Sequence, residues 1–249
     1  MLLDAIVLAG GRSSRLGGEP KQHLIVDGRS LLHRTLDAAR EAGAQRVVVV
    51  GEPALAAEIA GALAGTGTGT GADRGASIEV VREEPAFGGP VAAIAAGVAA
   101  LGMTAPGMSA LGQASASART PSSGEHGILV LACDMPGCAD AVAALVIAAG
   151  ETAHGARGHR QGGVDGFAAV DASGRRQHLL ALYDAAALTA AVQRVGARLD
   201  GLAVRTLVEP LELREVPIPA GAADDVDTWD DAERLGARSP LERRSPDEC

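Results

Sequence analysis

The feature that most constrains the fold is the repeated pairing of a short apolar run with a helical pattern. Ala5–Leu8, residues 46–51 (RVVVVG) and residues 77–83 (SIEVVRE) are brief and rich in apolar side chains. The first two runs are typical of buried strands of a parallel sheet, and the third predicts a further strand. Helical spacing follows them, as in the segment that Ser30 can cap and Gly43 can end. This alternation predicts βαβ units and a three-layer α/β fold around a mainly parallel sheet.

The same alternation continues in the second half of the chain. Residues 127–136 (GILVLACDMP) predict another strand, and residues 165–183 predict a hairpin that turns at DASG. Helical patterns follow at 140–150 and 185–195. We therefore expect a single domain over residues 1–238.

Three stretches break this pattern. Residues near 65–77 and 102–127 are rich in Gly, Ser, Thr and Ala and have no apolar periodicity, so we expect flexible surface insertions there. The polar tail, residues 239–249, is expected to be disordered.

Composition and charge exclude several classes of function. The formal net charge of −9 argues against a protein that coats nucleic acid, because such a protein needs a basic face. No apolar stretch is long enough to span a membrane without glycine or charge, and the start lacks the basic residues of a signal peptide. The three cysteines match neither a typical zinc pair nor a disulfide framework. We expect a cytoplasmic monomer that binds neither nucleic acid nor membranes.

The first strand runs into a loop rich in glycine and basic residues, LAGGRSSRLGGEPK, from Leu8 to Lys21. It matches neither the P-loop nor the G-x-G-x-x-G dinucleotide pattern. Its glycines allow a ligand to approach the backbone, and Arg15 and Lys21 supply positive charge. On its own the loop is equally consistent with a phosphate site and with a glycine-rich connection carrying solvated basic residues.

Three groups of polar or glycine-rich residues follow predicted strands: Gly10–Lys21, Glu83–Pro90 and Asp134. Ligands of open parallel α/β sheets bind in the crevice at the carboxyl ends of the strands. The coincidence of the three groups therefore predicts a ligand site at that edge. The alternative for Asp134 is a polar cap after a buried strand, which its position at the strand end between Cys133 and Met135 makes the less favoured interpretation.

The opening loop resembles the nucleotidyltransferase signature L-A-G-G-x-S-x-R-M/L-G-x-x-K. Three further stretches, GGPVAAIAAGV, LACDMP and DVDTWDDAERL, occur in the order and at about the distances expected of the molybdenum cofactor guanylyltransferase family, and QHLLALY resembles a fifth shared segment. The resemblance extends to about Leu235. It implies a Rossmann-like fold of the nucleotide-diphospho-sugar transferase type, and an enzyme that moves GMP from GTP onto the phosphate of molybdopterin or its molybdenum form.

The resemblance also assigns roles to individual residues. Residues expected to bind the nucleotide are Leu8, Ala9, Gly10, Gly11, Gly17, Gly18 and, from the pair Glu83 and Glu84, preferably Glu84. Arg15 and Lys21 would offset the charge of the triphosphate and its transition state. Asp134 would bind Mg²⁺, with Asp227 as a second carboxylate, although this last position is often Asn in the family.

The reaction fits these residue types, because a phosphate monoester is already a nucleophilic anion at pH 7 and needs no general base. Mg²⁺, lysine and arginine would supply the electrostatic stabilisation. The resemblance further implies transient contacts with proteins that deliver the molybdenum cofactor.

Two alternatives to this function stay open. One is a related transferase that uses CTP or another phosphorylated acceptor, because the departure at Glu83 and Glu84 leaves the base preference unsettled. The other is a nucleotide-binding module without catalysis.

Some residues outside these motifs also carry expectations. Arg176 and Gln177 are either acceptor contacts or ordinary polar residues of the hairpin, and the basic segment His154–Gly163 is either an acceptor loop or a solvated one. Trp229 is expected to anchor the last segment to the core.

Overall fold

The computed structural model describes residues 1–11, 14–65, 76–103, 126–155, 163–196 and 198–240. Most of the two predicted insertions and of the predicted tail lies outside these described residues, as does most of the basic segment His154–Gly163. Among the described residues, no helix combines the length and the apolar character that crossing a membrane requires.

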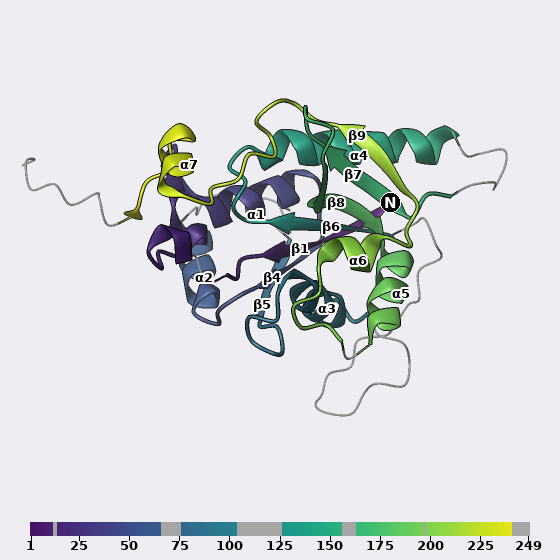
Figure 1. The fold of residues 1–249 in the computed structure, drawn as a ribbon, viewed down its shortest axis with the longest axis horizontal. Coiled ribbons are helices and arrows are strands. Elements are labelled where there is room, and N and C mark those ends of the chain that lie inside the picture. The colour runs from purple at the N-terminus through teal and green to yellow at the C-terminus, as the bar shows by residue number, and fades with distance from the viewer. Residues whose placement is uncertain (12–13, 66–75, 104–125, 156–162, 197, 241–249) are drawn as a thin grey trace, which may run out of the picture.

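A seven-stranded mixed sheet forms the centre of the molecule (Figure 1). Its strands, in spatial order, are β5 (Ser77–Val81), β4 (Arg46–Val50), β1 (Leu2–Leu8), β6 (His126–Ala132), β8 (Arg176–Asp184), β7 (Gly166–Val170) and β9 (Leu213–Pro217). The first four pair in parallel, β8 runs antiparallel to both of its neighbours, and β9 pairs in parallel with β7. The predicted α/β class with a mainly parallel sheet is confirmed.

Helices cover both faces of the sheet (Figure 1). One face carries α1 (Leu31–Glu41), α2 (Leu55–Gly65) and α4 (Cys138–Gly155), and the other carries α3 (Pro90–Ala100), α5 (Ala185–Val195) and α6 (Val204–Val208). Along β1, Ala5 and Val7 join the first core, while Ile6 and Leu8 join the second. This double burial explains why the strand reads as a continuous apolar run.

Sequence patterns located these elements better than they located their ends. Helix α4 extends five residues beyond the predicted end at 150, and the short helix α6 was not predicted. The VDG turn is confirmed as the link between β2 (Ile25–Val26) and β3 (Arg29–Ser30), where Asp27 and Gly28 both have positive φ angles. Two adjacent residues with positive φ are what a tight hairpin turn of this type requires.

A third, smaller apolar cluster lies beside the main fold and joins both ends of the chain. Leu16, Leu24 and Leu31 from the N-terminal region pack with Val226 and with α7 (Trp229–Arg234). The expectation that Trp229 anchors this segment is wrong, because its side chain is 42% exposed. The small buried residues Ala232 and Ala237 do so together with Val226.

The contact between α3 and β1 depends on a glycine. A Cβ atom on Gly97 would lie 2.6 Å from Cγ2 of Ile6, which is closer than real Cβ contacts allow.

We predict that Gly97→Ala lowers the free energy of unfolding by about 1–3 kcal/mol, because the helix must move away from the sheet. The matched control is Gly61→Ala in α2, where nothing lies within 4 Å, and which should stabilise by about 0.5–1 kcal/mol. Denaturant unfolding measures both, and equal effects would contradict this packing.

Candidate active site

The segments that follow the parallel strands meet at one edge of the sheet and line a pocket of about 540 Å³. Leu8 and Gly10 come from the end of β1, Val50 from the end of β4, and Glu83 and Asp134 from beyond β5 and β6. The antiparallel strand β8 begins at this edge and adds Leu179. The predicted crevice at the carboxyl ends of the strands is therefore present as a pocket.

The side chain of Lys21 lies between two carboxylates in this pocket. Its Nζ atom is 3.4 Å from Oδ2 of Asp134 and is hydrogen-bonded to Oδ1 of Asp227. Arg15 approaches Asp227 from the solvent side, with 3.5 Å between NH1 and Oδ2. The structure thus brings together the four charged residues that the sequence singled out, from segments up to 212 positions apart.

Backbone hydrogen bonds join the Asp134 segment to the end of β1 and to the segment that carries Asp225 and Asp227. The carbonyl of Leu8 accepts from the backbone N–H of Cys133 over 3.1 Å, and the carbonyl of Asp134 accepts from that of Val226 over 3.0 Å. Val226 is fully buried, so Asp225 and Asp227 on either side of it are left at the surface. One carboxylate oxygen from each of Asp134, Asp225 and Asp227 lies within 4.8 Å of the others.

This donor set fits a hard divalent cation. Mg²⁺ and Mn²⁺ prefer carboxylate oxygens, and the three aspartates offer three oxygens within reach of one ion. The signal that could have identified Asp225 is the D-V-D pattern, since residues two apart in an extended segment share a side.

Burial and charge act in opposite directions on the central pair. Burial raises the pKa of Asp134 above its usual value, and the Lys21 ammonium only partly offsets that effect. Partial burial lowers the pKa of Lys21, but the hydrogen bond to Asp227 and the charge of Asp134 outweigh it and leave the pKa raised. Lys21 is therefore fully charged at neutral pH. It is also the only lysine in the 249 residues.

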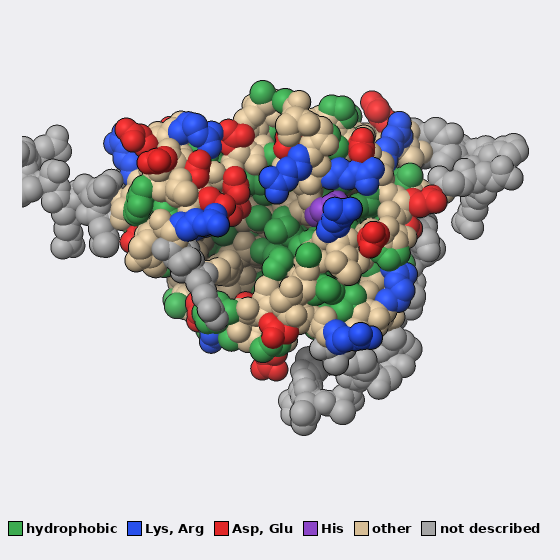
Figure 2. Space-filling view, in the orientation of Figure 1, with side chains coloured by type: hydrophobic (Ala, Val, Ile, Leu, Met, Phe, Trp, Pro, Cys, Tyr) green, Lys and Arg blue, Asp and Glu red, His purple; other side chains and the backbone are tan. Residues whose placement is uncertain are grey.

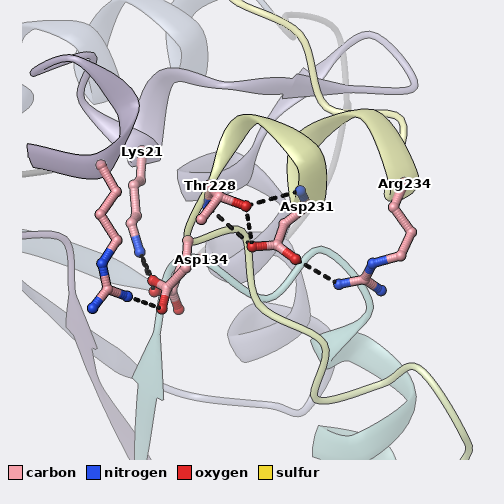
Figure 3. Close-up of polar contacts among 7 residues, drawn as sticks. Lys21, Asp134, Thr228, Asp231 and Arg234 are labelled. Atoms are coloured by element: carbon pink, nitrogen blue, oxygen red, sulfur yellow. Dashed lines mark hydrogen bonds and ion pairs between the residues drawn. The ribbon is translucent and has the colours of Figure 1, made fainter.

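Thr228 follows Asp227 directly and is the N-cap of helix α7, where it forms a capping box with Asp231 (Figure 3). The Thr228 hydroxyl accepts from the backbone N–H of Asp231, whose carboxylate accepts from the N–H and the hydroxyl of Thr228. Arg234 donates to Asp231 and Asp224. This capping box fixes the position at which the chain presents Asp227.

The residues expected to bind the nucleotide are placed in three ways. Leu8, Gly10 and Gly11 line the pocket, while Ala9 between them is buried and donates its N–H to the Val50 carbonyl. Gly17 and Gly18 have positive φ angles in an exposed turn and do not line it. Of the two acidic candidates, Glu83 lines the pocket and is only 8% exposed, whereas Glu84 is exposed and does not.

Strand β8 bulges where it enters the pocket. Its register against β7 shifts between Ala168 and Ala169, and the Tyr183 hydroxyl supports the bulge by donating to the His178 carbonyl over 2.8 Å. Burial, together with the charges of Arg176 and Arg205, lowers the pKa of His178, so this imidazole is neutral at pH 7. Figure 2 shows basic side chains and a histidine along the border of a hollowed, apolar patch.

The two polar residues before the bulge make ordinary contacts within the sheet. Arg176 donates from Nε to Glu215 over 2.7 Å, and Gln177 donates to Asp171 over 2.9 Å. These contacts agree with the alternative that they are polar residues of the hairpin. Phe87 and Gln22 also line the pocket, and no sequence pattern identified either of them as a site residue.

Comparison with known families gives a direct match. Residues 5–211 match the MobA-like NTP transferase domain. Comparison with curated proteins gave no significant match.

Solved structures with the same fold cover nearly the whole chain. The homologue of Mycobacterium tuberculosis Rv0371c from Mycobacterium sp. strain JC1 is 26% identical, with a TM-score of 0.56 and 94% of each chain covered. A nucleotidyl transferase from Methanothermobacter (Mth528) is 21% identical, with a TM-score of 0.58 over 94% of this chain and 95% of that one. The manganese complex of Rv0371c from M. tuberculosis H37Rv is 22% identical, with a TM-score of 0.56 over 94% and 97%. The sheet is thus that of the nucleotide-diphospho-sugar transferase fold.

The charge balance of the pocket can be tested by removing the ammonium group. Lys21→Met leaves neighbouring carboxylates without their ammonium, so we expect a loss of about 1 kcal/mol of stability at pH 7 with EDTA, a modest figure because these side chains are partly exposed. Mg²⁺ should restore more stability to this variant than to the wild type. Thermal unfolding with and without Mg²⁺ measures both effects. The control is Arg29→Met, which removes an exposed ion pair with Asp37; an equal response to Mg²⁺ in both variants would refute the account.

The capping box gives the stability of the protein a dependence on pH. Hydrogen bonds from Thr228, and then from Arg234, lower the pKa of Asp231 to about 2. A depressed pKa stabilises the folded state above the unfolded value of about 3.9, and this contribution is lost as the pH falls through 4 towards 2. Thr228→Ala should therefore destabilise the folded protein more at pH 7 than at pH 3, because it removes the cap and the hydrogen bonds that favour the ionised Asp231 carboxylate. Urea unfolding at both pH values tests this, and a cost independent of pH would contradict it.

Proposed function

The chain belongs to the family of MobA-like NTP transferase domains, and from that premise we propose that it moves GMP from GTP onto the terminal phosphate of molybdopterin or its molybdenum form. Residues 1–238 would act as one nucleotidyltransferase domain. The observation that carries the proposal is the cluster of Lys21, Asp134 and Asp227, which lines the pocket of about 540 Å³.

The reaction needs charge compensation more than proton transfer. An oxygen of the acceptor phosphate bonds to the α-phosphorus of GTP, the bond from that phosphorus to the bridging oxygen breaks, and pyrophosphate leaves. Negative charge builds up on the non-bridging and leaving oxygens. Lys21 and Arg15 lie at the same end of the pocket and are suited to offset that charge.

Asp134, Asp227 and Asp225 are the residues that would hold a divalent cation. The ion, when bound, would neutralise phosphate charge and orient the triphosphate. The manganese complex of the mycobacterial Rv0371c is a reason to test Mn²⁺ beside Mg²⁺. The Lys21 ammonium lies between the carboxylates of Asp134 and Asp227. Binding of a cation there would free Lys21 to contact a phosphate oxygen.

The remaining pocket residues suit the nucleoside. The backbone of Gly10 and Gly11 can approach the ligand closely, because neither residue carries a side chain. Glu83 replaces Glu84 in our proposal as the acidic residue that accepts hydrogen bonds from the nucleotide, since it is Glu83 that lines the pocket. The choice of GTP and of a pterin acceptor rests on the motifs GGPVAAIAAGV, LACDMP and DVDTWDDAERL.

The test is release of pyrophosphate from each of the four NTPs, with and without molybdopterin and with Mg²⁺ or Mn²⁺. We expect turnover with GTP that depends on both the acceptor and the metal. Asp134→Ala should reduce kcat by at least roughly 100-fold while the protein stays folded, since electrostatic stabilisation of this kind is worth that much. Turnover with CTP instead would favour the cytidylyltransferase alternative, and nucleotide binding without any turnover would favour the binding module.

A lysine-to-arginine variant tests whether the pocket needs more than positive charge. Arginine is planar and forked and cannot place a single point charge between Asp134 and Asp227 as lysine does. We expect Lys21→Arg to lose at least about tenfold in kcat despite its unchanged charge. Arg29→Lys, at a solvent-exposed ion pair, is the matched control with wild-type turnover. Full activity in Lys21→Arg would remove the specific role of this residue.

A further inference from the structure

Phe87 is an aromatic side chain in an unusual setting. The chain has two phenylalanines, one tyrosine and one tryptophan. Phe167 and Tyr183 are buried, and Trp229 lies on α7 away from the pocket. Phe87 lines the pocket and is 46% exposed there, so packing in a core does not account for it.

The backbone conformation at Phe87 is also energetically unfavourable. Its φ angle is +60°, in the left-handed region that a bulky side chain rarely adopts. The buried Glu83 holds this conformation, because its Oε1 atom accepts the Phe87 N–H over 3.1 Å. The next residue, Gly88, is fixed by hydrogen bonds to Pro85 and from Gly201. The surrounding segment thus holds the ring at the pocket wall, as is typical of strained residues with a function.

The position of Phe87 within the pocket indicates what it contacts. Its segment follows β5, whereas Asp134 follows β6, and these strands are three places apart in the sheet. Three strand spacings are about 14 Å, a distance that an extended nucleoside triphosphate can span. Lys21 and Arg15 supply the positive charge of the pocket, and Val50, Pro90 and Ala93 line it with apolar groups.

We propose that Phe87 is a stacking platform for the nucleobase of the bound NTP. This inference rests on the proposed function, because it takes the pocket to be the nucleotide site. Arg82, with its guanidinium carbon 5.8 Å from the ring centroid, supports the ring from its own segment. The Glu83 carboxylate has two neighbours. Its Oε1 atom accepts the hydrogen bond from the Phe87 backbone, and the same atom would lie 3.7 Å from a Cβ atom built on Gly10. A base stacked on Phe87 is therefore also next to a hydrogen-bond acceptor.

The test compares nucleotide and triphosphate binding by isothermal titration calorimetry in the full chain. The ligands are Mg²⁺–GTP, or whichever of the four NTPs binds the wild type most tightly, and Mg²⁺–tripolyphosphate, which lacks a base. Phe87→Ala should weaken NTP binding roughly 5- to 100-fold, the range of base–aromatic stacking. It should leave tripolyphosphate binding unchanged, and Phe87→Tyr should retain NTP affinity.

Two further variants separate stacking from folding. Phe87→Gly removes the ring and relieves the left-handed backbone, so it should lose the same affinity as Phe87→Ala while melting at a higher temperature than Phe87→Ala does. Ile147→Ala, at another exposed apolar residue far from the pocket, is the control with unchanged affinity.

Three outcomes would overturn the inference. NTP affinity that is unchanged in Phe87→Ala would remove the stacking role and leave the proposed function intact. An equal loss for NTP and tripolyphosphate would show that the ring supports the fold of the segment instead. A wild type that binds none of the four NTPs would reject both the stacking role and the proposed function.

Discussion

The site depends on one electrostatic constraint: three carboxylates converge, and a single lysine holds two of them together. Asp134, Asp225 and Asp227 bring their oxygens within 4.8 Å of one another, an arrangement that is unfavourable without a cation between them. The Lys21 ammonium meets this need for Asp134 and Asp227. The same arrangement suits exchange of the ammonium for a metal ion, which would leave lysine available for phosphate. The convergence of the three carboxylates therefore accounts both for the position of Lys21 and for the proposed metal site.

The fold supplies the geometry for this constraint by two independent means. Parallel pairing of β1 with β6 places the opening loop and Asp134 at the same edge of the sheet. The small apolar cluster of Leu16, Leu24, Leu31 and Val226 then clamps the C-terminal segment against the opening loop. Since burial of apolar surface is non-directional, the capping box at Thr228 and the hydrogen bond from Val226 to Asp134 set the orientation of Asp227.

The sequence predicted the sheet and the charged centre because both have local signatures. Double burial produces the apolar runs of β1 and β4, and strand ends mark Lys21 and Asp134 as neighbours in space. Other features depend on tertiary packing and leave no periodic signal in the sequence. These are the exposed position of Trp229, the bulge at His178, and the placement of Glu83 instead of Glu84 in the pocket. Phe87 was missed for the same reason, since a positive φ angle at phenylalanine cannot be read from its type. One signal went unused: Lys21 is the only lysine among 22 basic residues, and lysine and arginine are not interchangeable in a phosphate site.

The central claim is that the cluster of Lys21, Asp134 and Asp227 is the metal and triphosphate site of a nucleotidyltransferase. A crystal structure with Mn²⁺ and a GTP analogue carrying a methylene bridge between the α- and β-phosphates tests it most directly. The account predicts anomalous density for manganese at Asp134 and Asp227, with the Lys21 ammonium moved from the carboxylates to a phosphate oxygen. A nucleotide bound elsewhere, with the lysine still between the two aspartates and no manganese beside them, would contradict it.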